Sequence, residues 1–269
     1  MTKNDTLTEE EFASFTPKPT LLHFLEMYRK EHKINKNELN VLDWGCGRGR
    51  TVLYLKDLGY NAYGVDIDIK PILNGAGLFK AKGYDENALS LLSKGKTIYP
   101  DNYFHFIMSN QVFEHVSDIQ SVSVELSRIT KKNGAGFHIY PGYRRINEGH
   151  LLMPLVHWLP KNTLRKKAIF AYVLAGKEPK WKELNNCTIT QKVDAYYAYS
   201  INKTFYRRLS DVIKIFEDAG FLVTIETINS PKVSNNKLLK QLVKQGISKD
   251  LLNYLLATFA RVDLYAKKH

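Results

Sequence analysis

The sequence predicts an α/β fold built around a mostly parallel sheet, with an inserted segment in its second half. Between residues 40 and 141, short apolar runs alternate with segments whose apolar residues recur at helical spacing. Such alternation is typical of parallel strands joined by right-handed helical crossovers. From about 142 to 209 the pattern becomes aromatic, basic and irregular, and strands and helices return from 210 onward.

These changes of pattern predict four parts. We expect residues 1–39 to form an N-terminal helical cap and 40–141 to form the core of the sheet. Residues 142–209 would be an inserted, partly helical segment, and 210–269 the helices and edge strands that complete the sheet. A late antiparallel hairpin at the edge of the sheet would account for the last two strands.

The first elements of the chain alternate as a parallel sheet requires. Residues 7–36 predict a leading helix, and a strand over 40–44 then leads into a glycine-rich turn. The helix after this turn ends at Gly59, because glycine suits the C-terminal cap of a helix. A second strand, 62–65, ends at Asp66.

The next elements continue the alternation. The apolar run "FHFIMSN" predicts a buried strand that ends at Asn110. Ser117 and Gln120 have the spacing of a capping box, which predicts the start of a helix that closes at Gly134. The run "GFHIYP" predicts the following strand.

The last sixty residues predict two helices and two strands. Ser210 is expected to cap a helix that stops at Gly220, and "FLVTIETI" then predicts a strand. One helix over about 236–256 and a final strand in "TFARVDLYAKK" would follow.

Composition narrows the classes of protein to consider. No stretch approaches the roughly 18–20 apolar residues of a membrane span, and we expect none. The polar, acidic N-terminal sequence lacks the order of a secretory signal, and two cysteines cannot form a disulfide framework, so we expect a cytoplasmic protein. The formal net charge is +12, but the lysines are spread over the whole length, so we do not expect nucleic acid as the partner.

The stretch "VLDWGCGRGR" has the most specific pattern in the chain. Glycine is needed where the backbone turns tightly or approaches a ligand closely, and Gly45, Gly47 and Gly49 alternate after a strand. In open parallel sheets, ligands bind at the carboxyl ends of such strands. A dinucleotide-binding turn has its third glycine three positions after the second, so this turn departs from that pattern.

With Asp43 before it, this turn resembles motif I of the class I S-adenosylmethionine-dependent methyltransferases. "GVDI" is similar to the second-strand motif of that family, and "PDNYFHFIMSNQVFEHV" and "ELSRITKKNGAGFHI" resemble later motifs of its type 11 branch. The resemblance covers residues 40–141 well and 205–266 loosely. It implies a Rossmann-like, doubly wound, mostly parallel sheet of seven strands, with S-adenosylmethionine as cofactor and no metal.

The resemblance also implies the residues that bind the cofactor. Asp66 would accept both ribose hydroxyls, Asp43 would fix the turn near the methionine end, and Ile67 would pack on adenine. Two departures leave the adenine contacts open, because His105 stands where the family usually has Asp and the acidic residue that often meets adenine has no clear match in "SKGKTIYPDN". The full set is Asp43, Trp44, Gly45, Cys46, Gly47, Gly49, Asp66, Ile67, Asn110, Gln111 and His115.

An activated sulfonium methyl needs an aligned acceptor and exclusion of water. In the family, the segment after the fifth strand helps to bound the acceptor pocket. We expect His150 to be the general base, with Glu148 close enough in sequence to orient it, and His157 as the second candidate. Either histidine could instead have a structural role.

Five further residues are predicted to contact the acceptor. Guanidinium groups match phosphate and carboxylate oxygens, although these arginines could also lie in a solvated loop. We therefore expect O-methylation of a hydroxyl on a small polar or anionic acceptor, such as a phosphorylated or nucleotide-linked sugar of a surface-polysaccharide precursor. The alternatives are a lipid or quinone-like acceptor, RNA, or an inactive cofactor-binding subunit. The five residues are Glu114, Tyr140, Tyr143, Arg144 and Arg145.

Overall fold

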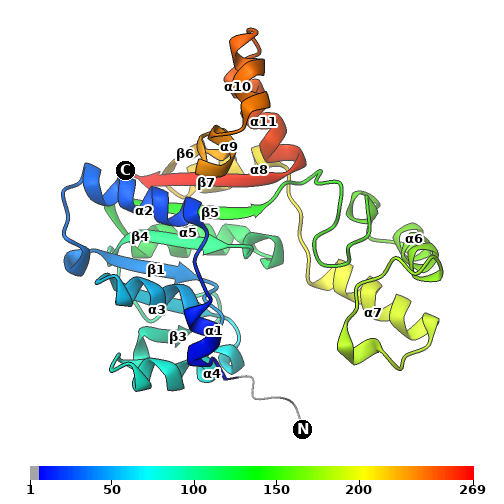
Figure 1. Cartoon of the computed structure of the whole chain (residues 1–269), viewed down its shortest axis with the longest axis horizontal. Coiled ribbons are helices and arrows are strands. Elements are labelled where there is room, and N and C mark those ends of the chain that lie inside the picture. Colours follow the sequence, from blue (N-terminus) through cyan, green and yellow to red (C-terminus); the bar gives the residue numbers. More distant parts are fainter. Residues whose placement is uncertain (1–5) are drawn as a thin grey trace.

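The computed structural model describes residues 6–269, and its centre is a seven-stranded sheet with helices on both faces (Figure 1). The strand order is β3-β2-β1-β4-β5-β7-β6, and β7 runs antiparallel to both of its neighbours. The predicted doubly wound, mostly parallel sheet is confirmed. The strands are β1 Asn40–Trp44, β2 Asn61–Asp66, β3 Leu89–Leu91, β4 Phe104–Asn110, β5 Thr130–Pro141, β6 Phe221–Ile225 and β7 Arg261–Lys268.

The helices form two layers, because alternate strand residues face opposite sides of the sheet. Val41 belongs to the core under α2, α3 and α4, and the adjacent Leu42 to the core under α5 and α8. The α-helices are α1 Glu9–Ala13, α2 Pro19–Glu31, α3 Arg50–Asp57, α4 Ile69–Ala81, α5 Ile119–Ile129, α6 Thr163–Leu174, α7 Ile189–Asn202, α8 Leu209–Asp218, α9 Pro231–Ser234, α10 Lys237–Lys244 and α11 Lys249–Phe259.

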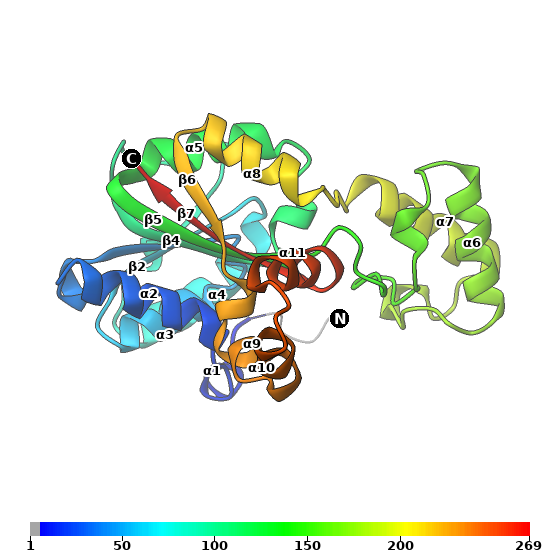
Figure 2. The same ribbon diagram turned by 90° about the horizontal axis from the view of Figure 1, so that it is seen from above.

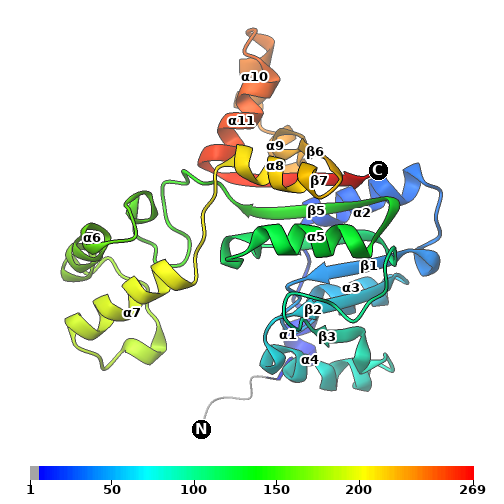
Figure 3. The same ribbon diagram turned by 180° about the vertical axis from the view of Figure 1, so that it is seen from behind.

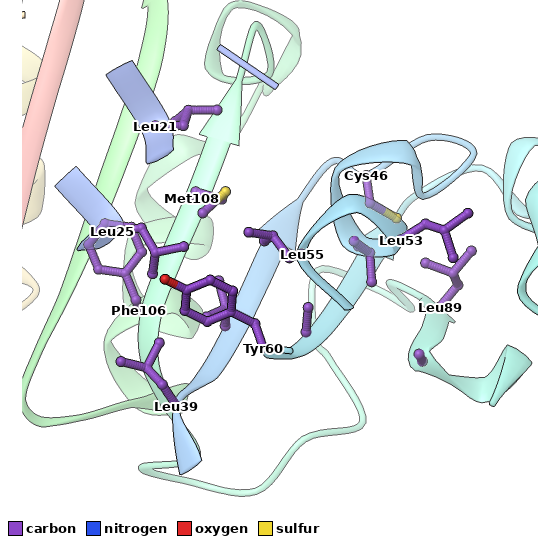
Figure 4. Close-up of a cluster of buried hydrophobic side chains, with 14 of the residues drawn as sticks. Leu21, Leu25, Leu39, Cys46, Leu53, Leu55, Tyr60, Leu89, Phe106 and Met108 are labelled. Atoms are coloured by element: carbon purple, nitrogen blue, oxygen red, sulfur yellow. The ribbon is translucent and has the colours of Figure 1, made fainter. Parts of the chain in front are cut away.

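The larger core lies between the sheet and helices α2, α3 and α4. Figure 4 shows side chains from helices and strands meeting there, among them Leu25, Leu55 and Phe106, each of which is fully buried. Burying one such side chain contributes roughly 1.5–3 kcal/mol to stability. This core fixes the position of β1 and of the turn that follows it.

The inserted segment has a small core of its own. Leu151, Met153, Val156, Ile169 and Tyr196 are buried together, apart from the two cores of the sheet. Helices α6 and α7 lie in a lobe beside the sheet (Figure 2), joined to it by the chain after β5 and the chain before α8 (Figure 3). No helix within residues 6–269 is both long enough and apolar enough to cross a membrane.

Four predicted helix boundaries were wrong, among them the end of α5, which stops at Ile129 instead of Gly134 because β5 begins at Thr130. Helix α5 is capped by Asp118 instead of Ser117, because the Asp118 carboxylate accepts both the N–H and the hydroxyl of Ser121. Helix α8 begins before Ser210, whose hydroxyl donates to Asp211. The helix expected over 236–256 is two helices, because Gly246 takes a φ of +90° and ends α10.

Two elements of the core region were not predicted, and the helix expected over 7–36 is two helices, α1 and α2. The three-residue strand β3 is too short for a periodic signal. Helix α4 contains Pro71, Gly75 and Gly77, which interrupt its pattern. Gly75 serves close packing, because a Cβ there would lie 2.1 Å from the carbonyl oxygen of Arg48 in the glycine turn.

Candidate active site

The glycine turn after β1 requires all three of its glycines. Gly45, Gly47 and Gly49 have φ values of +79°, +55° and +74°, a conformation that costs other residues about 1–2 kcal/mol. A Cβ on Gly45 would lie 2.4 Å from the Val112 side chain, and one on Gly49 would lie 2.8 Å from Leu89. The turn is therefore packed against Val112, which follows β4, and against Leu89, the first residue of β3.

Asp66, at the end of β2, holds this turn in place. One of its carboxylate oxygens accepts the Gly47 N–H at 2.8 Å, and the other accepts the Asp68 N–H at 3.0 Å. Val65 supports the same contact, because its carbonyl oxygen accepts the N–H groups of Gly45 and Cys46. The carboxylate thus joins the two strand ends and also borders the cavity described next.

A cavity of about 530 Å³ lies at the carboxyl ends of β1, β2 and β4. The sheet order reverses between β1 and β4, the place at which open α/β sheets bind ligands, and the volume is typical of cofactor sites. Six residues predicted to bind the cofactor line this cavity, which we call the cofactor cavity: Trp44, Gly45, Asp66, Ile67, Gln111 and His115.

The other five predicted residues lie behind the cavity wall. Asp43 is 6% exposed. Burial raises the pKa of its carboxyl to about 7, although a hydrogen bond with Thr51 acts to lower that pKa. Cys46 is buried against Gly64. Because Asp43 is not among the lining residues, its role in fixing the turn fits the geometry better than contact with the methionine end. Gly47, Gly49 and Asn110 are likewise outside the lining.

The sequence did not reveal two stretches of the lining. Leu92, Lys94 and Gly95 line the cofactor cavity from the loop after β3, at the start of the stretch that lacks the family's acidic adenine contact. Ser117 and Asp118, before α5, close the opposite side. The first stretch could have been found from its position, because it directly follows β3, the strand that pairs with β2.

A second cavity, of about 590 Å³, lies beside the first and shares Gln111 with it. Its lining includes the cationic side chains of Lys18, Arg145 and Arg261, and Arg261 is paired with Asp263 at 2.7 Å. Phe259, at the end of α11, forms part of its wall. The second cavity is therefore suited to a polar or anionic molecule next to the cofactor cavity.

His150 lies outside the cofactor cavity, next to a histidine that lines it. Its imidazole contacts that of His115 edge-on, with ring centroids 4.6 Å apart, and His115 lines the cavity. The Nδ1 atom of His115 lies 2.7 Å from the Lys203 carbonyl oxygen. Burial lowers the pKa of His150, which favours a neutral ring at neutral pH.

Glu148 does not orient the ring of His150 as expected. One of its carboxylate oxygens accepts the backbone N–H groups of His150 and Leu151, and the other accepts the Tyr206 hydroxyl at 2.6 Å. The carboxylate is 2% exposed, so it satisfies the nearest backbone donors of its own turn. It fixes the loop that carries His150, and no carboxylate within residues 6–269 forms a hydrogen bond with the imidazole.

Glu114 and Tyr140 are buried behind these two histidines. Glu114 is 1% exposed and Tyr140 is 5% exposed, so neither matches the predicted acceptor contact. The pKa of Glu114 is raised to about 7, mainly by burial, and the nearby charge of Glu148 acts in the same direction. Donor atoms of Glu114, His115 and His150 lie within 4.8 Å of one another, and carboxylate and imidazole could together hold a cation there.

The remaining predicted residues separate into different places. Arg145 lines the second cavity, whereas Tyr143 and Arg144 line another cavity on the far side of α11. His157 is buried in the inserted segment with its ring 4.6 Å from that of Tyr206, and burial lowers its pKa to about 4. Like His150, His157 lines neither the cofactor cavity nor the second one, but its ring contacts are with Trp158 and Tyr206 instead of a residue of either cavity, which favours a structural role.

Comparison with known proteins identifies the core of the chain. Residues 42–137 match the family described as methyltransferase domain, type 11. Curated relatives include the ubiquinone biosynthesis O-methyltransferases of Rickettsia felis and Rickettsia akari. The first is 24% identical over 222 residues, covering 72% of this chain and 89% of the relative. The second is 27% identical over 157 residues, covering 53% of this chain and 61% of the relative, so the chain spans less than two thirds of it.

Solved structures share the fold at low identity. A geranyl diphosphate methyltransferase has a TM-score of 0.52 and 12% identity, with 92% of this chain and 79% of that chain covered. An S-adenosylmethionine-dependent methyltransferase from Mesorhizobium loti has a TM-score of 0.51 and 12% identity, with 88% and 95% covered. Residues 42–137 therefore form a methyltransferase domain of the type 11 family, which uses S-adenosylmethionine, and the solved structures support the same fold for the chain as a whole.

Proposed function

We propose that this S-adenosylmethionine-dependent methyltransferase methylates a hydroxyl on a small polar or anionic acceptor, such as a phosphorylated or nucleotide-linked sugar of a surface-polysaccharide precursor. The second cavity carries this proposal. Lys18 and Arg145 would pair with phosphate oxygens there, and Gln111 adjoins both the acceptor and the cofactor.

For the cofactor, we propose the contacts that the resemblance implied. The Asp66 carboxylate borders the cavity and would accept the ribose hydroxyls, while Ile67, 76% exposed, would pack on adenine. The glycine turn fits this group, because a Cβ on Gly45 would clash with the cavity wall. The cofactor supplies an activated methyl group.

His150 is our candidate for the general base. As the acceptor oxygen bonds to the methyl carbon and the carbon–sulfur bond breaks, the hydroxyl proton must leave. A neutral imidazole can take it, and burial keeps the pKa of His150 low enough for the ring to be neutral. Its contact with His115 supports a position next to the reacting atoms.

The first test is transfer of labelled methyl groups to sugar phosphates and nucleotide-linked sugars. We expect Arg145→Gln to raise the KM of an anionic acceptor about tenfold, with little change for Arg144→Gln, because the two arginines line different cavities. Equal effects of the two substitutions would contradict the proposed acceptor cavity.

The second test concerns His150. We expect His150→Gln to lower kcat about 100-fold while the affinity for S-adenosylhomocysteine is unchanged. His23→Gln, at an exposed histidine of α2, is the control. An unchanged kcat for His150→Gln would remove this histidine from the reaction.

A second candidate acceptor is a phenolic ring of the kind methylated in quinone synthesis. The names of the curated relatives favour it. Faster methylation of catechol-type acceptors than of any sugar would support this candidate against the main proposal. Binding of S-adenosylhomocysteine without turnover on either class would instead favour an inactive subunit.

A further inference from the structure

Helices α10 and α11 form an arm, residues 237–259, which meets the proposed acceptor cavity at Phe259, the last residue of α11. Figure 1 shows α10 extending away from the sheet, and none of its residues is buried. Helix α11 connects the arm to the body through the buried residues Leu252 and Ala257. The arm is therefore attached at one end and exposed along most of its length.

The arm exposes apolar side chains at helical spacing. On α11, Leu251, Leu255 and Phe259 recur every fourth residue and are 52%, 40% and 41% exposed. On α10, Leu238 and Val243 are 63% and 39% exposed. Leu251, Leu255 and Phe259 therefore form an exposed apolar stripe on α11, a feature typical of interaction surfaces.

The charge around this apolar surface is almost entirely positive. Between residues 231 and 259 the chain has one acidic residue, Asp250, and five lysines: Lys232, Lys237, Lys240, Lys244 and Lys249. On α10, Lys237, Lys240 and Lys244 follow one another at three- and four-residue spacing, so they share a helix face.

A groove of about 380 Å³ between α9 and α10 combines both properties. Val233, Leu239 and Val243 supply apolar walls, and Lys240 and Lys244 stand beside them. An apolar surface with adjacent lysines is complementary to an amphiphile with an acidic head group.

The arm also leads to the proposed acceptor site. Phe259 and Ala260, where α11 ends, line the second cavity together with Gln111 and Arg145. Tyr254 and Phe259 line the cavity on the other side of α11, which contains Arg144 and Arg208. A surface bound along the arm would therefore lie next to the acceptor cavity.

We propose that the α10–α11 arm docks the enzyme onto an anionic phospholipid bilayer. The exposed leucines and Val243 enter the boundary between head groups and acyl chains, and the lysines pair with lipid phosphates. An RNA site would use stacking aromatic rings and arginines, whereas this arm has mainly aliphatic side chains and lysines. The proposal goes beyond the methyltransferase function and does not depend on the identity of the acceptor.

The test is flotation of the full chain with vesicles. We expect binding to vesicles that contain phosphatidylglycerol and little binding to pure phosphatidylcholine. Lysine near an anionic surface contributes about fivefold to binding, so reversing three charges should weaken it on the order of 100-fold or more. The variant is Lys237→Glu/Lys240→Glu/Lys244→Glu.

A matched control reverses three exposed lysines outside the arm. The triple variant Lys30→Glu/Lys80→Glu/Lys167→Glu has the same net charge, and we expect it to keep vesicle binding within about threefold of the wild type. Both variants should bind S-adenosylhomocysteine as the wild type does, which shows that the fold is intact.

The apolar contribution is tested by Leu238→Ser/Val243→Ser, which leaves the charge unchanged. Both side chains are exposed, so the fold should persist while vesicle binding falls at least tenfold. Equal binding to both vesicle types, equal losses in the two lysine triples, or tight RNA binding abolished by the arm variant would each overturn the proposal. Methylation of a water-soluble acceptor should be unaffected, which separates this test from that of the proposed function.

Discussion

Alanine at Gly45 and at Gly47 should have different effects, although the two glycines lie in the same turn. Both have positive φ, so each substitution costs about 1–2 kcal/mol of backbone strain. At Gly45 the new Cβ would also lie 2.4 Å from Val112, and overpacking of this kind costs about 1–3 kcal/mol more. At Gly47 nothing lies within 4 Å of the Cβ position.

We therefore expect Gly45→Ala to lose about 2–5 kcal/mol of unfolding free energy and Gly47→Ala about 1–2 kcal/mol, measured by urea unfolding. Because Val112 lines the cofactor cavity, Gly45→Ala should also weaken S-adenosylhomocysteine binding. Adding Val112→Ala to Gly45→Ala removes the two closest atoms and should recover part of both losses. Equal losses for the two single variants, or no recovery in the double variant, would refute the reasoning.

Two further predictions concern α4 and the buried carboxyl of Glu114. Gly75→Ala should destabilise the protein by about 2 kcal/mol or more, because its Cβ would meet the Arg48 carbonyl oxygen. Gly77→Ala has open space around its Cβ and should stabilise the protein by about 0.5–1 kcal/mol. Thermal unfolding measures both changes, and changes of the same sign would contradict this prediction. The folded-state pKa of Glu114 is raised from 4.5 to about 7 by burial, so its contribution to stability is fully present below pH 4.5 and is lost, by about 3 kcal/mol, as the pH rises to 7. Glu114→Gln should flatten urea-unfolding stability across that interval, and an unchanged slope would show that the carboxyl is ionised in the fold.

The sequence predicted the structure well at positions where a residue type has a single structural role. Gly45 and Gly49 could be assigned to a close backbone approach because few other positions require alternating glycines after a strand. The last two strands were also predictable as apolar runs, and they pair antiparallel at the edge of the sheet as expected, although three helices separate them in place of a hairpin turn.

The sequence predicted the structure less well where contacts between distant residues determine the local conformation. Pro71, Gly75 and Gly77 look like helix breakers, yet α4 forms because Gly75 allows it to pack on the turn. The spacing of Glu148 and His150 suggested a carboxylate–imidazole pair. The backbone donors of that loop are closer to the carboxylate, and spacing alone cannot rank the two partners.

The neighbouring arginines illustrate the same limit. Arg144 and Arg145 are adjacent residues of the same type, so the sequence does not distinguish them. The chain after β5 turns so that they line different cavities. The charge of the α10–α11 arm could be counted from the sequence, whereas its exposure depends on Gly246, which ends α10 and leaves that helix without buried residues.

The most direct test of the account is calorimetric titration with S-adenosylhomocysteine, with NAD as the control ligand. We expect micromolar binding by the wild type and a loss of at least about 100-fold for Asp66→Ala, because the carboxylate would accept two ribose hydroxyls and also holds Gly47. Asp68→Ala, which removes only the cap of α4, should keep the affinity. Binding of NAD in place of S-adenosylhomocysteine, or equal affinities for the two variants, would contradict the assignment of this cavity.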